Sequence, residues 1–221
     1  MLSLEQPPPN YFRIALQSAL AAVLCLGLPA GLLLWLIIIQ RIHHSAAIEP
    51  LFNFLNTHGL FRIYLVAFSS ILWSYLLGRI SGYRPWWWLA VASAVGILAA
   101  WFSPLSNVDG ILYNYRPDLP IYLNYAGSMV GLIGSVTLFV GLGYGLILKS
   151  IKAALIIGLS TSITSIVVLL LTIFIFDRLG LRVGTGNMAM VRVTAIDLIT
   201  SALAGGAMLG VGFSHFVTKE K

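Results

Sequence analysis

Long apolar segments are the feature that most restricts what this chain can fold into. Six of them follow one another, and each keeps nearly all of its charged side chains at its two ends. A helix needs about 20 predominantly apolar residues to cross the hydrocarbon core of a membrane. The pattern therefore predicts an all-α, polytopic membrane protein with about six transmembrane helices, at residues 14–39, 61–77, 86–102, 121–148, 153–176 and 191–217.

Composition supports the same class of protein. Of the 221 residues, 59% are hydrophobic and only 9% are charged, whereas about a quarter of the residues in a soluble domain are charged. Six spans and their connections use the whole chain, so we expect residues 1–221 to form a single integral membrane domain. The first apolar segment is too long for the hydrophobic part of a cleaved signal, and we interpret it as a retained span.

The net charge of +6 does not indicate nucleic-acid binding. The 13 Lys and Arg residues stand singly or in pairs at segment ends, where such side chains anchor helices at the membrane surface. The positive-inside rule then predicts a cell (inner) membrane protein with both termini in the cytoplasm. The side that holds both termini has one more basic residue than the other side, and its residues are Arg13, Arg79, Arg84, Lys149, Lys152, Lys219 and Lys221.

Small residues predict how the last three spans pack. In span 191–217, Gly205 lies on one face, and Gly206 and Gly210 lie on the opposite face. Because small residues let helix backbones approach closely in lipid, we expect a helix against each of these faces. Spans 121–148 and 153–176 also align Gly and hydroxyl residues, which predicts a compact C-terminal three-helix core. The N-terminal half is bulkier and more aromatic, so we expect it to face lipid or a partner subunit.

Three local features predict details of the helices. Pro29, close to Gly27, predicts a kink in the first span. Consecutive tryptophans at 86–88 predict an aromatic belt at the membrane interface. Only residues 149–152 separate the fourth and fifth spans, which predicts a tight antiparallel hairpin.

Asp197 is the one ionisable residue that cannot easily be assigned to a segment end. A carboxylate in hydrocarbon is costly and usually faces protein or a water-filled cavity. It could bind a proton, a cation or the ammonium group of a ligand, or it could be a structural acid paired with Arg192 or Arg182. Both interpretations stay open. The possible ligand or ion contacts on the last three spans are Asp197, Asn124, Ser162 and Ser201.

The chain has no recognisable motif for catalysis or for a cofactor. Motifs of zinc proteases, serine hydrolases and cysteine enzymes are missing from the sequence. Four histidines, at 43, 44, 58 and 215, could ligate haem, a metal or a pigment, but none lies in the middle of a span, and interfacial solvation explains all four. We therefore predict a non-enzymatic protein with no catalytic residue and no metal site, and the cofactor stays unknown.

Two functional hypotheses follow from these patterns. The first is an accessory or scaffold subunit of a larger membrane complex, respiratory or photosynthetic, with the lipid bilayer and other membrane subunits as its partners. The scarcity of polar groups within the spans favours it. The second is a small-solute transporter, or the substrate-binding membrane component of an importer. Six spans in about 200 residues suit this class, with a shallow polar site between the last three spans.

Overall fold

The computed structural model describes residues 10–29, 50, 64–104, 121–180 and 187–219. Apart from short turns, nearly all of this part of the chain is helical, which confirms the all-α class. Its elements are α1 (Tyr11–Ala22), continued by the π-helical turn η1 (Val23–Gly27); η2 (Tyr64–Ser69), continued by α5 (Ser70–Ser81); α6 (Trp86–Phe102); α8 (Ile121–Ile147); α9 (Ile151–Arg178); and α10 (Asn187–Lys219).

Three helices are long and apolar enough to cross a membrane. The apolar stretches cover Met129–Ile147 of α8, Ile151–Phe176 of α9 and Ile196–Thr218 of α10. Tyr11–Gly27 and Trp86–Phe102 are shorter apolar helices. These helices indicate a membrane protein, in agreement with the composition. The number of spans stays a prediction, because segments 14–39 and 61–77 lie partly outside the described residues.

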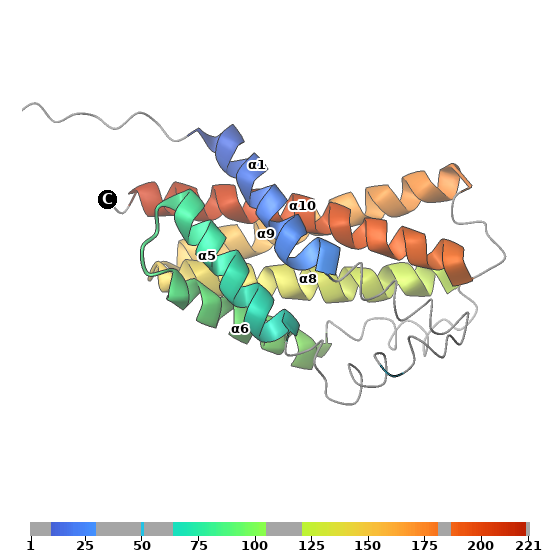
Figure 1. The fold of residues 1–221 in the computed structure, drawn as a ribbon, viewed down its shortest axis with the longest axis horizontal. Coiled ribbons are helices and arrows are strands. Elements are labelled where there is room, and N and C mark those ends of the chain that lie inside the picture. Colours follow the sequence, from blue (N-terminus) through green and yellow to red (C-terminus); the bar gives the residue numbers. More distant parts are fainter. Residues whose placement is uncertain (1–9, 30–49, 51–63, 105–120, 181–186, 220–221) are drawn as a thin grey trace, which may run out of the picture.

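The six helical segments form a closed ring. Each packs against the next along the chain, and α1 closes the ring by packing against both α5 and α10. Figure 1 shows α8, α9 and α10 running along the long axis, while α1 and α5 cross them obliquely in the half of the molecule that holds the C-terminus. A ring of this kind has an interior that every segment can reach.

Glycine contacts fix the closest helix pairs. A Cβ added to Gly141 of α8 would lie 2.7 Å from the Cα of Gly158 on α9, so these two backbones touch. On α10, Gly205 faces Ser165 of α9, whereas Gly206 lies directly on α1. This confirms the prediction that helices pack against both faces of the last span.

The hairpin between α8 and α9 is as tight as predicted. The chain leaves α8 after Ile147 and enters α9 at Ile151, with Lys149 in a left-handed conformation at φ 54°. At the start of α6, the rings of Trp87 and Trp88 are about half exposed and stack with centroids 4.1 Å apart. This position agrees with an interfacial belt.

The structure adds two details to the predicted helices. The second span was expected to end at Leu77, but α5 continues to Ser81, and Gly82 takes the left-handed conformation that ends it. In the first span, the turn before Pro29 is π-helical, with the Leu28 amide donating to the Val23 carbonyl. Proline has no N–H to offer the carbonyl four residues earlier, and a wider turn relieves that clash. Residues beyond 29, where a kink would show, lie outside the described part.

The core is shared by both halves of the chain. Helices α8, α9 and α10 pack closely, as predicted, but the main cluster of buried apolar residues also includes Cys25, Trp73, Leu77 and Leu89 from the N-terminal helices. The expected division into a C-terminal core and a lipid-facing N-terminal half is therefore wrong in its extent. Hydrophobicity alone does not distinguish a lipid-facing aromatic residue from a buried one, because lipid tails and protein interiors are similarly apolar.

Gly141→Ala tests the α8–α9 contact. We expect the free energy of unfolding to fall by about 1–3 kcal/mol, because the added methyl group forces two touching backbones apart. Gly212→Ala is the matched control, since its nearest new contact lies at an ordinary 3.5 Å, and the better helix propensity of Ala makes it neutral or slightly stabilising. Thermal unfolding in detergent measures both. An equal loss in the two variants would contradict the packing described above.

Candidate functional site

Asp197 is fully buried and takes part in a polar interaction. The hydroxyls of Thr172 on α9 and Thr200 on α10 lie 3.3 Å apart. These two residues are therefore at the same height along the antiparallel helices α9 and α10. Asp197 therefore lies level with the last turn of α9, about one helical turn inside Arg178. The helix itself starts earlier than predicted, at Asn187, which places Asp197 almost three turns from its beginning.

The other predicted contact residues do not come together in one site. Ser162 donates a hydrogen bond of 2.9 Å to the Gly134 carbonyl, so its hydroxyl joins α9 to α8. The side chain of Asn124 lies outside the described residues, as does Arg182, one of the proposed partners of Asp197. Ser201, in contrast, lines two cavities between the described helices.

A cavity of about 90 Å³ lies at the centre of the ring, and we call it the central cavity. All six helical segments contribute to its wall. The inward-facing residues with hydroxyl groups come from five of them. The wall residues are Ala22, Leu26, Ser69, Ser70, Trp73, Ser93, Ile97, Val136, Thr137, Val140, Thr161, Ser201, Ala202, Gly205, Gly206 and Leu209.

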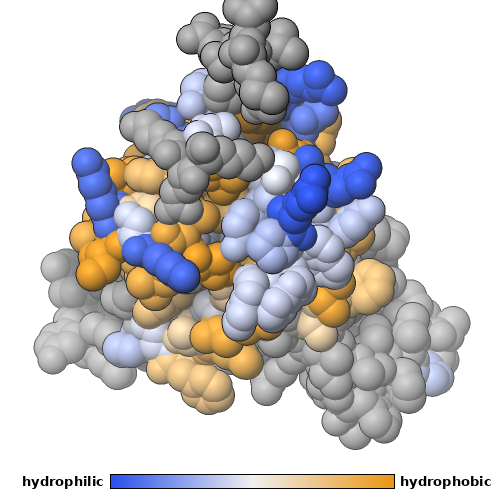
Figure 2. Space-filling model, turned by 90° about the vertical axis from the view of Figure 1, so that its left-hand side faces the viewer, coloured by the Kyte–Doolittle hydropathy of each residue, from blue (hydrophilic) through white to orange (hydrophobic). Residues whose placement is uncertain are grey.

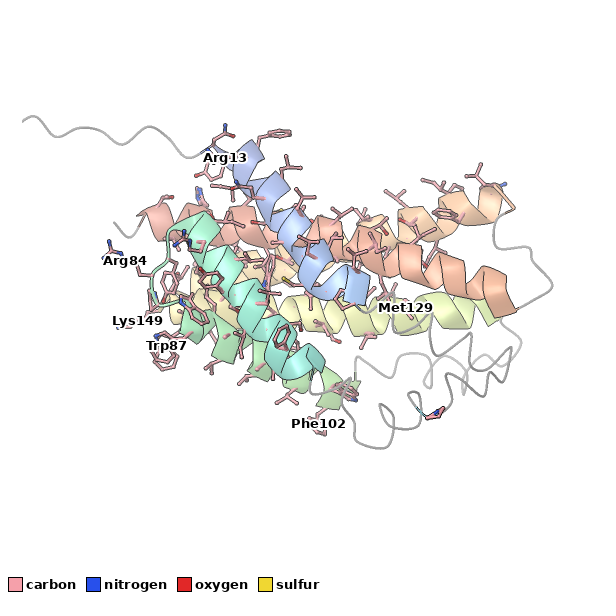
Figure 3. All side chains as sticks on the ribbon, viewed as in Figure 1. Arg13, Arg84, Trp87, Phe102, Met129 and Lys149 are labelled. Atoms are coloured by element: carbon pink, nitrogen blue, oxygen red, sulfur yellow. The ribbon has the colours of Figure 1, made fainter. Side chains whose placement is uncertain are left out.

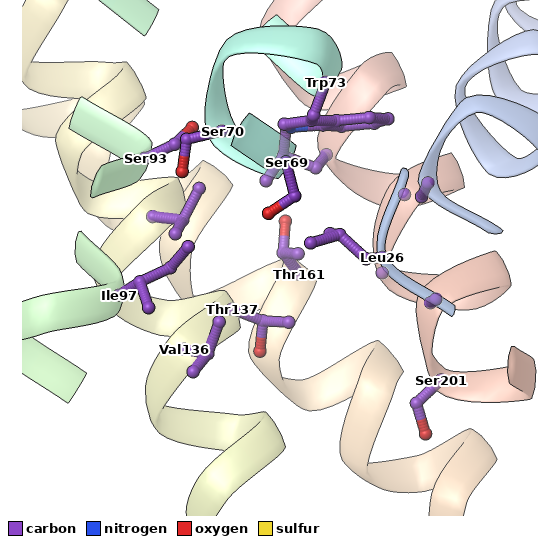
Figure 4. A pocket seen from close by; sticks show the side chains of 16 residues that line it. Leu26, Ser69, Ser70, Trp73, Ser93, Ile97, Val136, Thr137, Thr161 and Ser201 are labelled. Carbon is purple, nitrogen blue, oxygen red and sulfur yellow. The ribbon is translucent and has the colours of Figure 1, made fainter. Parts of the chain in front are cut away.

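Three wall hydroxyls have no hydrogen-bond partner within the described part of the chain. They belong to Ser70, Thr161 and Ser201, whose exposed fractions are 2%, 0% and 2%. Figure 4 shows the hydroxyl groups of Ser69 and Thr161 pointing into the space between the helices. A buried hydroxyl without a partner has a cost of about 1–3 kcal/mol. Three such groups around one cavity are therefore a feature to explain.

A second cavity of about 190 Å³ adjoins the first, and we call it the distal cavity. The two share six wall residues, Ser201 among them. The distal cavity continues toward Trp101, Ile133 and Leu198, which lie nearer to Asp197 along their helices than the wall of the central cavity does. The combined space therefore runs from the middle of the ring toward the end where Asp197 is buried.

Aromatic side chains close the opposite end. Tyr83 packs edge-on against Phe213, with ring centroids 5.3 Å apart, and Tyr144 contacts the same ring at 5.6 Å. These three residues form what we call the aromatic plug. The Tyr144 hydroxyl lies 2.6 Å from that of Ser93 and 3.4 Å from that of Ser74. Because Ser93 also lines the central cavity, this group of hydroxyls joins the plug to the cavity wall.

The plugged end is also the basic end of the molecule. Figure 3 places Arg84 and Lys149 there, near Trp87, and Arg13 at the start of α1 in the same half of the molecule. All three are exposed, and Figure 2, which views this end face-on, shows hydrophilic side chains scattered among hydrophobic ones. Basic residues that the sequence assigned to one side of the membrane thus lie at one end of the fold.

The described residues include no group of three or more His, Cys, Asp or Glu side chains that could hold a metal ion. His215 instead pairs with Tyr11, with 3.1 Å between the Tyr11 hydroxyl and Nδ1 of His215. This contact joins α1 to α10. Histidines 43, 44 and 58 lie outside the described residues, so the prediction of interfacial solvation is not addressed for them.

Sequence patterns missed most of the cavity wall. Ser69, Ser70 and Ser93 line the central cavity but lie in two spans that were expected to face lipid or a partner, and only the ring closure turns them inward. The sequence does contain one signal for them. An isolated serine within an aromatic, apolar segment is a polar group inside the membrane, and such groups usually face the interior of the bundle. Thr161 is one of the hydroxyl residues that align in the fifth span, but this alignment does not indicate that its hydroxyl faces a cavity.

Comparisons of the chain with protein-family models, with curated proteins and with solved structures find no match. The functional argument therefore rests on the residues and geometry described above.

Tyr144→Phe tests the hydroxyl group that joins the plug to the cavity. We expect the unfolding free energy to fall by about 1 kcal/mol, because the buried Ser93 hydroxyl loses its closest partner. Tyr75→Phe serves as control, since Tyr75 is 42% exposed. Thermal unfolding in detergent should separate the two by a few degrees. Identical midpoints for both variants would contradict a structural role for the 2.6 Å contact.

Proposed function

We propose that this protein binds a small solute in its ring of six membrane-spanning helices, as a carrier or as the substrate-binding membrane component of an importer. The observation that supports this proposal is the set of buried hydroxyls around the central cavity that have no hydrogen-bond partner among the described residues. A chain that only had to pack its helices would gain stability by replacing these groups with apolar ones. A solute that accepts or donates hydrogen bonds gives them a use.

The scaffold hypothesis has weaker support. It requires an outer surface that recognises another subunit, and the exposed residues, such as Phe12, Leu24, Phe102 and Ile151, are side chains that lipid covers equally well. An accessory subunit also has no need of hydroxyls directed into its own interior. Binding or transport requires no reacting group, in agreement with the prediction of a non-enzymatic protein.

Orientation belongs to the same proposal. The basic end carries Arg13, Arg79, Arg84, Lys149 and Lys152, all exposed, and the positive-inside rule places such an end in the cytoplasm. Both termini of the described chain lie at this end (Figure 1). The solute would then reach the cavities from the opposite side of the membrane, while the aromatic plug separates them from the cytoplasm.

Filling the cavity should remove the solute. We expect the protein purified in mild detergent to release a small molecule on solvent extraction, and Ser201→Leu to lower its amount at least tenfold, because the new side chain occupies space shared by both cavities. Ser160→Leu is the matched control, because Ser160 is only partly buried and lies outside both cavity walls. Mass spectrometry measures the extracts. Wild-type protein that holds no such molecule, but copurifies with unrelated subunits in fixed ratio, would favour the scaffold function instead.

Asp197→Asn separates the structural interpretation of the carboxylate from the functional one. Asp197 is buried yet lines neither cavity, so we expect lower thermal stability with the extracted solute retained. Loss of the solute at unchanged stability would place Asp197 in the binding site and contradict the structural interpretation.

A further inference from the structure

The cavity walls restrict the charge of a ligand. Within the described part of the chain, neither cavity has a charged side chain in its wall. An ion that enters such a site gives up its water without meeting an opposite charge, which is strongly unfavourable. The walls therefore favour an uncharged molecule.

The central cavity supplies the hydrogen-bonding part of the site. Thr161 and Ser70 are almost completely buried, and neither hydroxyl has a partner in the described chain. Other threonines of the bundle are satisfied by their own helix: Thr137 donates to the Ile133 carbonyl at 2.7 Å, and Thr172 donates to the Val168 carbonyl at 2.8 Å. The hydroxyls of Thr161 and Ser70 are therefore available to a ligand.

The distal cavity supplies an apolar part. Beyond the residues shared with the central cavity, its wall contains Trp101, Leu132, Ile133 and Leu198. Its volume is about 190 Å³, and an apolar cavity of roughly 150 Å³ is known to hold benzene. A single ring, or a branched aliphatic group of similar size, therefore fits.

We infer that the ligand is a compact, uncharged molecule with one hydroxyl or carbonyl group on an apolar body. Its polar group lies against Thr161 and Ser70, and its body fills the distal cavity. This inference rests on the proposed function, because it names the class of molecule that the same site takes.

Three probes of similar size test the inferred class. Benzyl alcohol has the hydroxyl and the apolar ring, toluene lacks the hydroxyl, and benzoate is charged. The midpoint of thermal unfolding of the full chain in one detergent is measured against probe concentration, because a ligand of the folded state raises it. We expect benzyl alcohol to bind roughly tenfold more tightly than toluene after each is corrected for partition into detergent, and benzoate to have no effect.

Two threonine variants of α9 form a matched pair. Thr161→Val should reduce the preference for benzyl alcohol over toluene to about twofold or less, and the midpoint of the unliganded protein should stay the same or rise, since an unpaired hydroxyl is removed. Thr172→Val should keep the wild-type preference but unfold at a lower temperature, because its hydrogen bond to Val168 is lost. Ser201→Leu should abolish the response to benzyl alcohol.

The outcomes separate this inference from the proposed function. If benzoate stabilises as strongly as benzyl alcohol, and Ser201→Leu removes both effects, the cavity binds solutes but the inferred class is wrong. If Thr161→Val keeps the wild-type preference, its hydroxyl does not recognise the ligand, and the inference fails. If no probe gives a response that depends on Ser201, the inference also fails, while the extraction experiment still decides the proposed function.

Discussion

Close contact between small residues is the constraint on which the whole structure depends. Helices in lipid gain nothing from hydrophobic burial against one another, so backbone approach and van der Waals packing must hold them together. The contact between Gly141 and Gly158 draws α8 and α9 together, and that between Gly96 of α6 and the backbone of Val140 does the same on the other side of α8. With Gly206 of α10 set against α1, these contacts close the ring. All six helical segments of this ring line the central cavity.

The interior of the ring is asymmetric along its axis. Toward the basic end it is filled by large side chains, with Tyr144 and Phe213 fully buried and the Ser93 hydroxyl in short contact with Tyr144. Toward the other end space opens between the helices, and Ser201 and Ala202 line both of the cavities found there. A helix bundle without an internal binding site would be expected to fill both halves equally, because voids lower the stability of the fold. The asymmetry therefore supports a one-sided binding site.

The sequence could predict those features that depend on one helix at a time. Helix positions, the hairpin at Lys149 and the two small-residue faces around Gly205 and Gly206 follow from local composition and helical periodicity. The site could not be predicted this way, because it depends on which faces of six helices meet. Ser93 and Thr161 are unremarkable hydroxyls in their own segments, and they become neighbours of one cavity only through ring closure. Asp197 stands out in the sequence because of its charge, which can be read from one residue alone. The cavity wall, in contrast, depends on how the six helical segments pack together.

Burying the cavity hydroxyls inside a membrane costs less free energy than burying the carboxylate of Asp197. An unpaired hydroxyl costs about 1–3 kcal/mol, which a bundle of this size can bear at Ser70, Thr161 and Ser201. A carboxylate without compensation costs far more, and Asp197, which lies level with the last turn of α9, is engaged in a polar interaction. In the proposed site, the polar groups must not destabilise the fold strongly when no solute is bound. Hydroxyls meet that condition in the middle of the ring, and a charge does not.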